Sequence, residues 1–150
     1  MTEIYVDADA CPVKEETLKV AARHGLKTHI VSNTWLRMAE GPLVKRVHVG
    51  EGFDAADDWI AEHIGPGDIA ITADVPLAAR CVKMGAVALA PDGKTFTEDS
   101  IGMAKAMRDL MTELRESGQI QSRNPAFRKE DRSRFLQALE NTIQIVKRQS

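Results

Sequence analysis

Two aspartates, Asp7 and Asp9, end an apolar stretch near the start of the chain, in the segment IYVDADACP (residues 4–12). Pro12 then opens a run that is typical of a helix, because proline is favoured in a helix's first turn. Carboxylates at such a junction can hold a metal ion or act as acids and bases. They can equally well end the strand and shape the turn that follows it. The pair therefore has to be weighed together with the other polar residues of the chain.

Polar side chains in comparable places follow other apolar segments or begin the next helix: Ser32, Asn33, Asp54, Asp57, Thr72 and Asp74. Any one of these aspartates could simply cap a neighbouring helix. Brought to one place they would repel one another and raise each other's pKa values unless a cation neutralised them. Carboxylate oxygens are the ligands preferred by Mg²⁺ and Mn²⁺. The pattern predicts a Mg²⁺ or Mn²⁺ site with these ligands: Asp7, Asp9, Asp54, Asp57 and Asp74. Asp7 and Asp74 are the predicted catalytic pair, and Ser32, Asn33 and Thr72 are predicted substrate contacts.

The alternation of apolar and helical segments indicates which elements position these residues. Strands are predicted at residues 3–7, 27–33, 45–50, 68–72 and 86–90, and helices at 12–24, 53–64 and 74–84. After the turn PDGKT (91–95) only helix is predicted, with apolar residues at helical spacing over 101–114 and 135–146. Short, continuously apolar strands separated by helices are typical of a parallel sheet covered on both faces. Ligands bind such sheets at the carboxyl ends of the strands, where the predicted site residues would meet.

The predicted fold is a three-layer α/β sandwich with a mostly parallel sheet of about five strands. A length of 150 residues suits one domain over 1–150, with residues 97–150 as a helical C-terminal extension. No apolar run reaches the roughly 18 residues of a membrane span. The start of the chain lacks the pattern of a secretory signal, and the two cysteines lack metal-ligand spacing. A cytoplasmic protein without a membrane partner is expected; its oligomeric state is left open.

The charge is unevenly distributed along the chain. Residues 1–100 carry 10 Lys and Arg against 16 Asp and Glu, whereas residues 101–150 carry 10 against 6. The basic part contains RNPAFRKEDRSRF (123–135), in which Arg128 and Arg132 are interleaved with phenylalanines. These two arginines are candidates for contacts with the phosphate backbone of RNA. A solvated start of a helix is the alternative.

Several longer segments occur in an order that resembles a known family: VDADACPVK, VGEGFDAADDWI, DIAITADVPLA, MAKAMRDLMTELRESG and DRSRFLQALE. From end to end the chain is similar to the YaiI/YqxD family of uncharacterised bacterial proteins. That family resembles, more distantly, the PIN-like (PIN/NYN) nuclease fold, which carries acids after its first strand, in a middle helix and after its fourth strand. Carried over, the resemblance implies acids at Asp7, at Asp54 or Asp57, and at Asp74, with Asp9 as a neighbour. It implies a nuclease-like site that uses Mg²⁺ or Mn²⁺.

Three functions are consistent with these patterns. The leading hypothesis is a metal-dependent nuclease, a phosphodiesterase acting on RNA. The second is a haloacid-dehalogenase-like phosphohydrolase, in which Asp7 would be the nucleophile and Asp9 the general acid, since the two have the D-x-D spacing of such enzymes. The third is a PIN-like domain without catalysis that binds nucleic acid or protein through residues 123–135.

Overall fold

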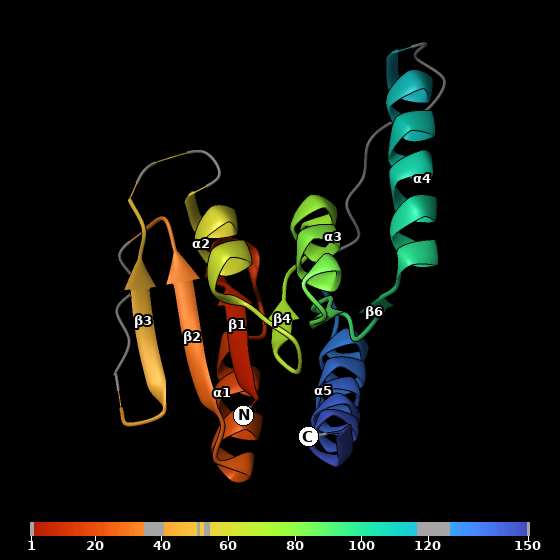
Figure 1. Cartoon of the computed structure of the whole chain (residues 1–150). Helices are drawn as coiled ribbons and strands as arrows, with labels where there is room; N and C mark the ends of the chain where they lie inside the picture. Colours follow the sequence, from red (N-terminus) through yellow and green to blue (C-terminus); the bar gives the residue numbers. More distant parts are fainter. Residues whose placement is uncertain (1, 35–40, 51, 53–54, 117–126, 150) are drawn as a thin grey trace.

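The computed structural model describes residues 2–34, 41–50, 52, 55–116 and 127–149 (Figure 1). Its described strands are β1 (Glu3–Asp7), β2 (Lys27–Ser32), β3 (Val44–His48), β4 (Ile69–Ile71), β5 (Val87–Leu89) and β6 (Thr95–Phe96). They form one sheet in the order β3-β2-β1-β4-β5-β6. The first five strands are mutually parallel, and β6 runs antiparallel to β5. The predicted α/β fold with a mostly parallel sheet is confirmed.

The antiparallel strand β6 corrects the expectation that only helix follows the turn at 91–95. The Ala90 N–H donates to the Lys94 carbonyl at 2.8 Å, and the Gly93 N–H donates to the Ala90 carbonyl at 2.9 Å. These bonds fold the chain back so that Ala88 pairs with Phe96. Two residues are too few to show the alternation of polar and apolar side chains by which a strand is recognised in a sequence.

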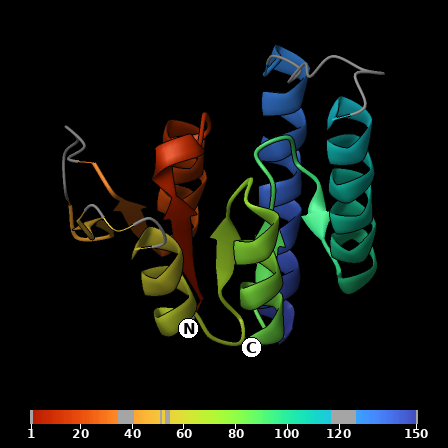
Figure 2. The ribbon, with the colours of Figure 1, turned by 90° about the horizontal axis from the view of Figure 1, so that it is seen from above.

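Helices cover both faces of the sheet. The helices are α1 (Lys14–His24), α2 (Ala55–His63), α3 (Val75–Lys83), α4 (Glu98–Glu116) and α5 (Lys129–Gln149), and a single 3₁₀ turn, η1 (Ala8–Ala10), links β1 to α1. α1 and α5 pack on one face, and α2 and α3 on the other. α4 lies against α3 at the edge of the molecule that carries β6 (Figures 1 and 2). The order of three layers matches the prediction, although α1 begins at Lys14, two residues later than Pro12.

The two faces of the sheet have separate apolar cores. In β1, Ile4 and Val6 point into the core beneath α1 and α5, whereas Tyr5 points into the core beneath α2 and α3. This alternation is the ordinary geometry of a strand. On α5, most of the side chains at helical spacing lie fully or almost fully in the first core, whereas Leu136 is only partly buried; the buried ones are Phe135, Leu139, Ile143 and Val146.

Two of the described apolar side chains at helical spacing on α4 are exposed rather than buried. Ile101 is buried, but the side chains of Met107 and Leu110 are 57% and 49% exposed. None of the helices in the part of the chain that the structure describes is long and apolar enough to span a membrane.

The strand order places a topological switch point between β1 and β4. From β1 the chain builds the sheet outward through β2 and β3, and then returns to add β4 and β5 on the other side of β1. The connections on the two sides of β1 therefore diverge. Open α/β sheets bind ligands in the crevice at such a switch point, here at the carboxyl ends of β1 and β4.

Candidate functional site

Asp7 ends β1 beside this crevice. It continues the alternation of β1 and so lies on the same face as Tyr5, toward α2 and α3. Its Oδ2 accepts a hydrogen bond of 2.9 Å from the hydroxyl of Thr72, the residue that follows β4. Burial raises the pKa of Asp7; the bond from Thr72 opposes this, and the charges of Asp74 and Asp9 add to it. Its Oδ1 accepts no hydrogen bond from the described residues, which leaves that oxygen available for a ligand.

Thr72 and Asp74 connect the end of β4 to α3. The Thr72 hydroxyl accepts from the Asp74 N–H at 3.0 Å, and Asp74 Oδ1 accepts from the Leu77 N–H at 2.9 Å. Asp74 thus caps α3, which was one of its two interpretations from the sequence. Its charge also raises the pKa of Asp7. Thr72, a predicted substrate contact, is buried and orients Asp7.

Asp9, two residues on, has a structural role. Its carboxylate accepts from the Ser32 hydroxyl at 2.6 Å, the Asn33 N–H at 2.8 Å and the Thr34 hydroxyl at 3.3 Å. Burial acts to raise the pKa of Asp9, but these hydrogen bonds outweigh it and bring the pKa below its ordinary value. Ser32 and Asn33, both predicted substrate contacts, hold Asp9 and so tie the loop after β1 to the end of β2.

The acids predicted in and before the middle helix are Asp54 and Asp57, and Asp54 lies outside the described residues. Asp57 is half-buried in the first turn of α2. Burial raises the pKa of the Cys81 thiol in α3 to about 12, and the charges of Asp57 and Asp7 add to this effect. Both carboxylates are therefore near enough to act on Cys81 through their charge.

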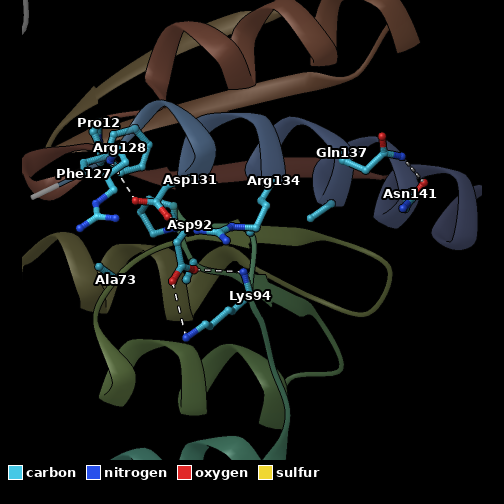
Figure 3. Close-up of a pocket in the computed structure, with 14 residues that line it drawn as sticks. Pro12, Ala73, Asp92, Lys94, Phe127, Arg128, Asp131, Arg134, Gln137 and Asn141 are labelled. Carbon is cyan, nitrogen blue, oxygen red and sulfur yellow. Dashed lines mark hydrogen bonds and ion pairs between the residues drawn. The ribbon is translucent and has the colours of Figure 1, made fainter. Parts of the chain in front are cut away.

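An open pocket of about 970 Å³ lies between the β5–β6 turn and the first turns of α5 (Figure 3). Pro12 and Ala73 are also among its lining residues. Ala73 stands between Thr72 and Asp74 in the chain, so this part of the lining is adjacent in sequence to the residues around Asp7. Its polar lining includes Lys94 and Arg134. Arg134 belongs to the basic segment 123–135, whereas the sequence did not single out Lys94, because the turn that carries it lies forty residues before Arg134.

The two arginines predicted to bind a phosphate backbone are separated by the structure. Arg128 lines the pocket, and its guanidinium has no hydrogen-bond or ion-pair partner among the described residues (Figure 3). Arg132 instead pairs with Glu16 at 3.3 Å and lies over the ring of Phe127, 5.8 Å from its centroid. Residues 123–126 of the basic segment are outside the described part of the chain.

Among the described residues, no group of three or more His, Cys, Asp or Glu side chains is arranged to hold a metal ion. Mg²⁺ commonly takes only one or two carboxylates and fills its other positions with water and substrate phosphate. Asp7 and Asp74 fit that requirement, because each keeps an oxygen that accepts no bond from the described residues. Asp9 does not fit it, since both of its oxygens are occupied by Ser32, Asn33 and Thr34.

A nucleophilic cysteine is not part of this site. Cys11 is buried, and that burial raises the pKa of its thiol to about 11. At neutral pH it is a protonated, packed side chain rather than a thiolate.

Comparison with known proteins identifies the family. The family model described as "Uncharacterized BCR, YaiI/YqxD family" matches residues 5–145. A UPF0178 protein of Parvibaculum lavamentivorans is 66% identical over 99% of this chain and 97% of its own. UPF0178 proteins of Rhodospirillum rubrum and of Rhodopseudomonas palustris strain TIE-1 are 60% and 58% identical, over 97% and 99% of this chain and 98% and 94% of theirs. No solved structure matches. The resemblance noted in the sequence is thereby confirmed, and the chain belongs to the YaiI/YqxD family.

Proposed function

We propose that the protein is a divalent-cation-dependent phosphodiesterase that cleaves RNA at the carboxyl ends of β1 and β4. The observation that carries the proposal is the state of Asp7. Its carboxylate is partly buried beside Asp74 and Asp9, and burial and those charges hold its pKa above the ordinary value. Such an arrangement costs folding free energy at neutral pH, and a bound cation would offset that cost.

Each side chain has a distinct part in this proposal. Asp7 and Asp74 would hold Mg²⁺ or Mn²⁺, with Asp57 on the adjoining helix as a further acid. Thr72 fixes the orientation of Asp7 through the hydrogen bond at 2.9 Å. Asp9 keeps the loop between β1 and α1 in place. When bound there, such a cation would supply Lewis acidity toward the phosphate and would favour deprotonation of the attacking water.

The phosphohydrolase alternative is disfavoured by the geometry of Asp9. A general acid must carry a proton near neutral pH. The hydrogen bonds that Asp9 accepts lower its pKa and keep it ionised. All three are bonds that a carboxylate accepts, so Asp9 is suited to holding the loop rather than to giving a proton to a leaving group.

The test is cleavage of an end-labelled single-stranded RNA by the purified protein in the presence of Mn²⁺ or Mg²⁺. Asp7→Asn and Asp74→Asn keep the shape of each side chain, and asparagine also retains the capping of α3. Both are expected to lower the cleavage rate by about 100-fold or more, the effect of removing charge stabilisation from a transition state. Asp58→Asn is the matched control, since Asp58 pairs with Arg80 on the exposed surface of α2.

The outcomes separate the three functions. Cleavage by Asp7→Asn at the rate of Asp58→Asn would place the activity elsewhere or in a contaminant. A beryllofluoride adduct on Asp7 would restore the phosphohydrolase. RNA binding without turnover under any divalent cation would leave a binding domain.

A further inference from the structure

We propose that the pocket between the β5–β6 turn and the start of α5 binds one nucleotide unit of a single-stranded nucleic acid. Arg128 would contact its phosphate. The inference rests on the proposed function for its substrate class, and it adds a binding subsite beside the carboxylates.

The first reason is the charge of the pocket. Three cations and two acids line it: Lys94, Arg128, Arg134, Asp92 and Asp131. Both acids already have partners, because Arg134 pairs with Asp131, and Lys94 Nζ lies 3.9 Å from Asp92 (Figure 3). Arg128 forms no ion pair with a described acid, although its charge, with that of Arg134, helps to lower the pKa of Asp131. An arginine that forms no ion pair within the protein can bind a phosphate group through two parallel hydrogen bonds.

The second reason is the apolar part of the lining. The side chains of Pro12, Pro91 and Phe127 line the same pocket as the cations. A nucleotide combines an anionic phosphate with a planar base, and the base requires an apolar or aromatic contact surface. A volume of about 970 Å³ is large enough for such a unit.

The third reason is position. Ala73 lies in the wall of the pocket between Thr72, which bonds Asp7, and Asp74. A chain with one phosphate at Asp7 can therefore place a neighbouring nucleotide in the pocket. In a duplex the bases are stacked and paired, so only an unpaired strand can turn a base into the pocket.

The bond that holds Arg128 at the start of α5 does not involve its side chain. The Arg128 backbone N–H, not its guanidinium, bonds Asp131 Oδ2 at 2.9 Å at the start of α5. Arg128→Ala therefore removes the charge and leaves this capping interaction in place.

The experiment measures binding of a fluorescent oligouridylate to the full chain by anisotropy, with EDTA present so that cleavage cannot occur. Arg128→Ala is expected to weaken binding roughly tenfold and to lower the salt dependence by about one phosphate contact. Arg148→Ala is the matched control, an exposed arginine at the far end of the same helix. Thermal unfolding of each variant checks that it is folded.

Two results would overturn the pocket assignment. One is Arg128→Ala binding as tightly as Arg148→Ala. The other is an unlabelled RNA duplex competing as well as the unlabelled single strand, which would indicate contact with the backbone alone.

Failure of the nuclease proposal gives a different result. Loss of binding in Arg128→Ala, together with normal cleavage by Asp7→Asn, would retain the pocket and remove Asp7 from the active site. Normal binding by Arg128→Ala, with cleavage lost in Asp7→Asn, would do the reverse.

Discussion

Asp7 and Asp9 show how two identical side chains two residues apart acquire different properties. Asp7 ends a central strand and accepts one hydrogen bond from Thr72, with an oxygen left over. Asp9 lies in the 3₁₀ turn after the strand and accepts three hydrogen bonds from residues 32–34. The pKa of Asp7 is accordingly raised by burial, and that of Asp9 is lowered by its hydrogen bonds despite burial. Only the first has the properties expected of a cation ligand.

Neutralising Asp7 is expected to stabilise the fold at neutral pH. Because the pKa of Asp7 is raised, the native state holds this proton more tightly than the unfolded chain. The free energy of unfolding therefore falls as the pH rises above the ordinary range of an aspartate, about 3.9. Asp7→Asn removes this loss and should raise the Tm at pH 7 by about 2–4 °C for each kcal/mol regained. The gain should shrink as the pH is lowered toward that range.

Thermal unfolding over a series of pH values checks this prediction, with Asp58→Asn as the control. Adding Mn²⁺ should raise the Tm of the unaltered protein and leave that of Asp7→Asn unchanged, since ligands that bind only the native state stabilise it. A lower Tm for Asp7→Asn at every pH would mean that the carboxylate stabilises the fold, contrary to the prediction.

At the scale of elements, the β5–β6 turn forms the pocket by packing directly on α5. Gly93 has a φ of 92°, in the left-handed region that favours glycine. A Cβ at this position would lie 2.7 Å from both the carbonyl carbon and the carbonyl oxygen of Arg134. The turn can therefore approach the backbone of α5 only because residue 93 has no side chain.

Gly93→Ala is expected to destabilise the protein by about 1–3 kcal/mol, since it adds backbone strain and a clash with main-chain atoms. Urea unfolding measures the change. Gly102→Ala is the matched control: a Cβ there meets nothing within 4 Å, and alanine in a helix interior is favoured over glycine by roughly 0.5–1 kcal/mol. Opposite signs for the two substitutions are the expected result, and equal effects would contradict the close packing of turn and helix. Gly93→Ala should also weaken oligouridylate binding, because it moves one wall of the pocket.

At the scale of the whole molecule, the packing of α5 determines whether the last helix unfolds together with the sheet or separately from it. This helix follows everything else in the sequence, yet it covers one face of the sheet together with α1. Phe135, at the centre of that contact, is fully buried. Glu140 reaches back to α1, where it pairs with Arg23 at 3.0 Å and His24 at 2.7 Å. The last helix is therefore a layer of the sandwich.

Phe135→Ala is expected to cost about 3–5 kcal/mol, the usual loss for removing a buried aromatic ring. That is a large part of the 5–15 kcal/mol by which domains are typically stable. Urea unfolding followed by circular dichroism should still show one cooperative transition, at a much lower midpoint. Ile145→Ala on the same helix is the control, since the Ile145 side chain is 51% exposed and should matter little. A separate early transition in Phe135→Ala, with the sheet left intact, would show that α5 folds as an independent extension.

Local features of the sequence determined most of the secondary structure. The apolar runs at 3–7 and 27–33, and the helical spacing from Phe135 to Val146, each encode an element within a few residues, so periodicity is sufficient to predict them. The family could be predicted for the same reason, because its segments are continuous. That Asp7 and Asp74 would stand at strand ends also followed from this pattern.

What the tertiary structure decided depends on contacts between residues far apart in the chain. Asp7 differs from Asp9 because Thr72, sixty-five residues away, bonds the first, and the end of β2 bonds the second. Arg128 differs from Arg132 because Glu16 on α1 pairs with only one of them. The strand β6 and the pocket both depend on the turn after β5. This turn packs on α5, a helix that begins more than thirty residues further along the chain. Burial, charge pairing and close approach are properties of these long-range contacts, whereas the pattern of neighbouring residues specifies only the elements that make them.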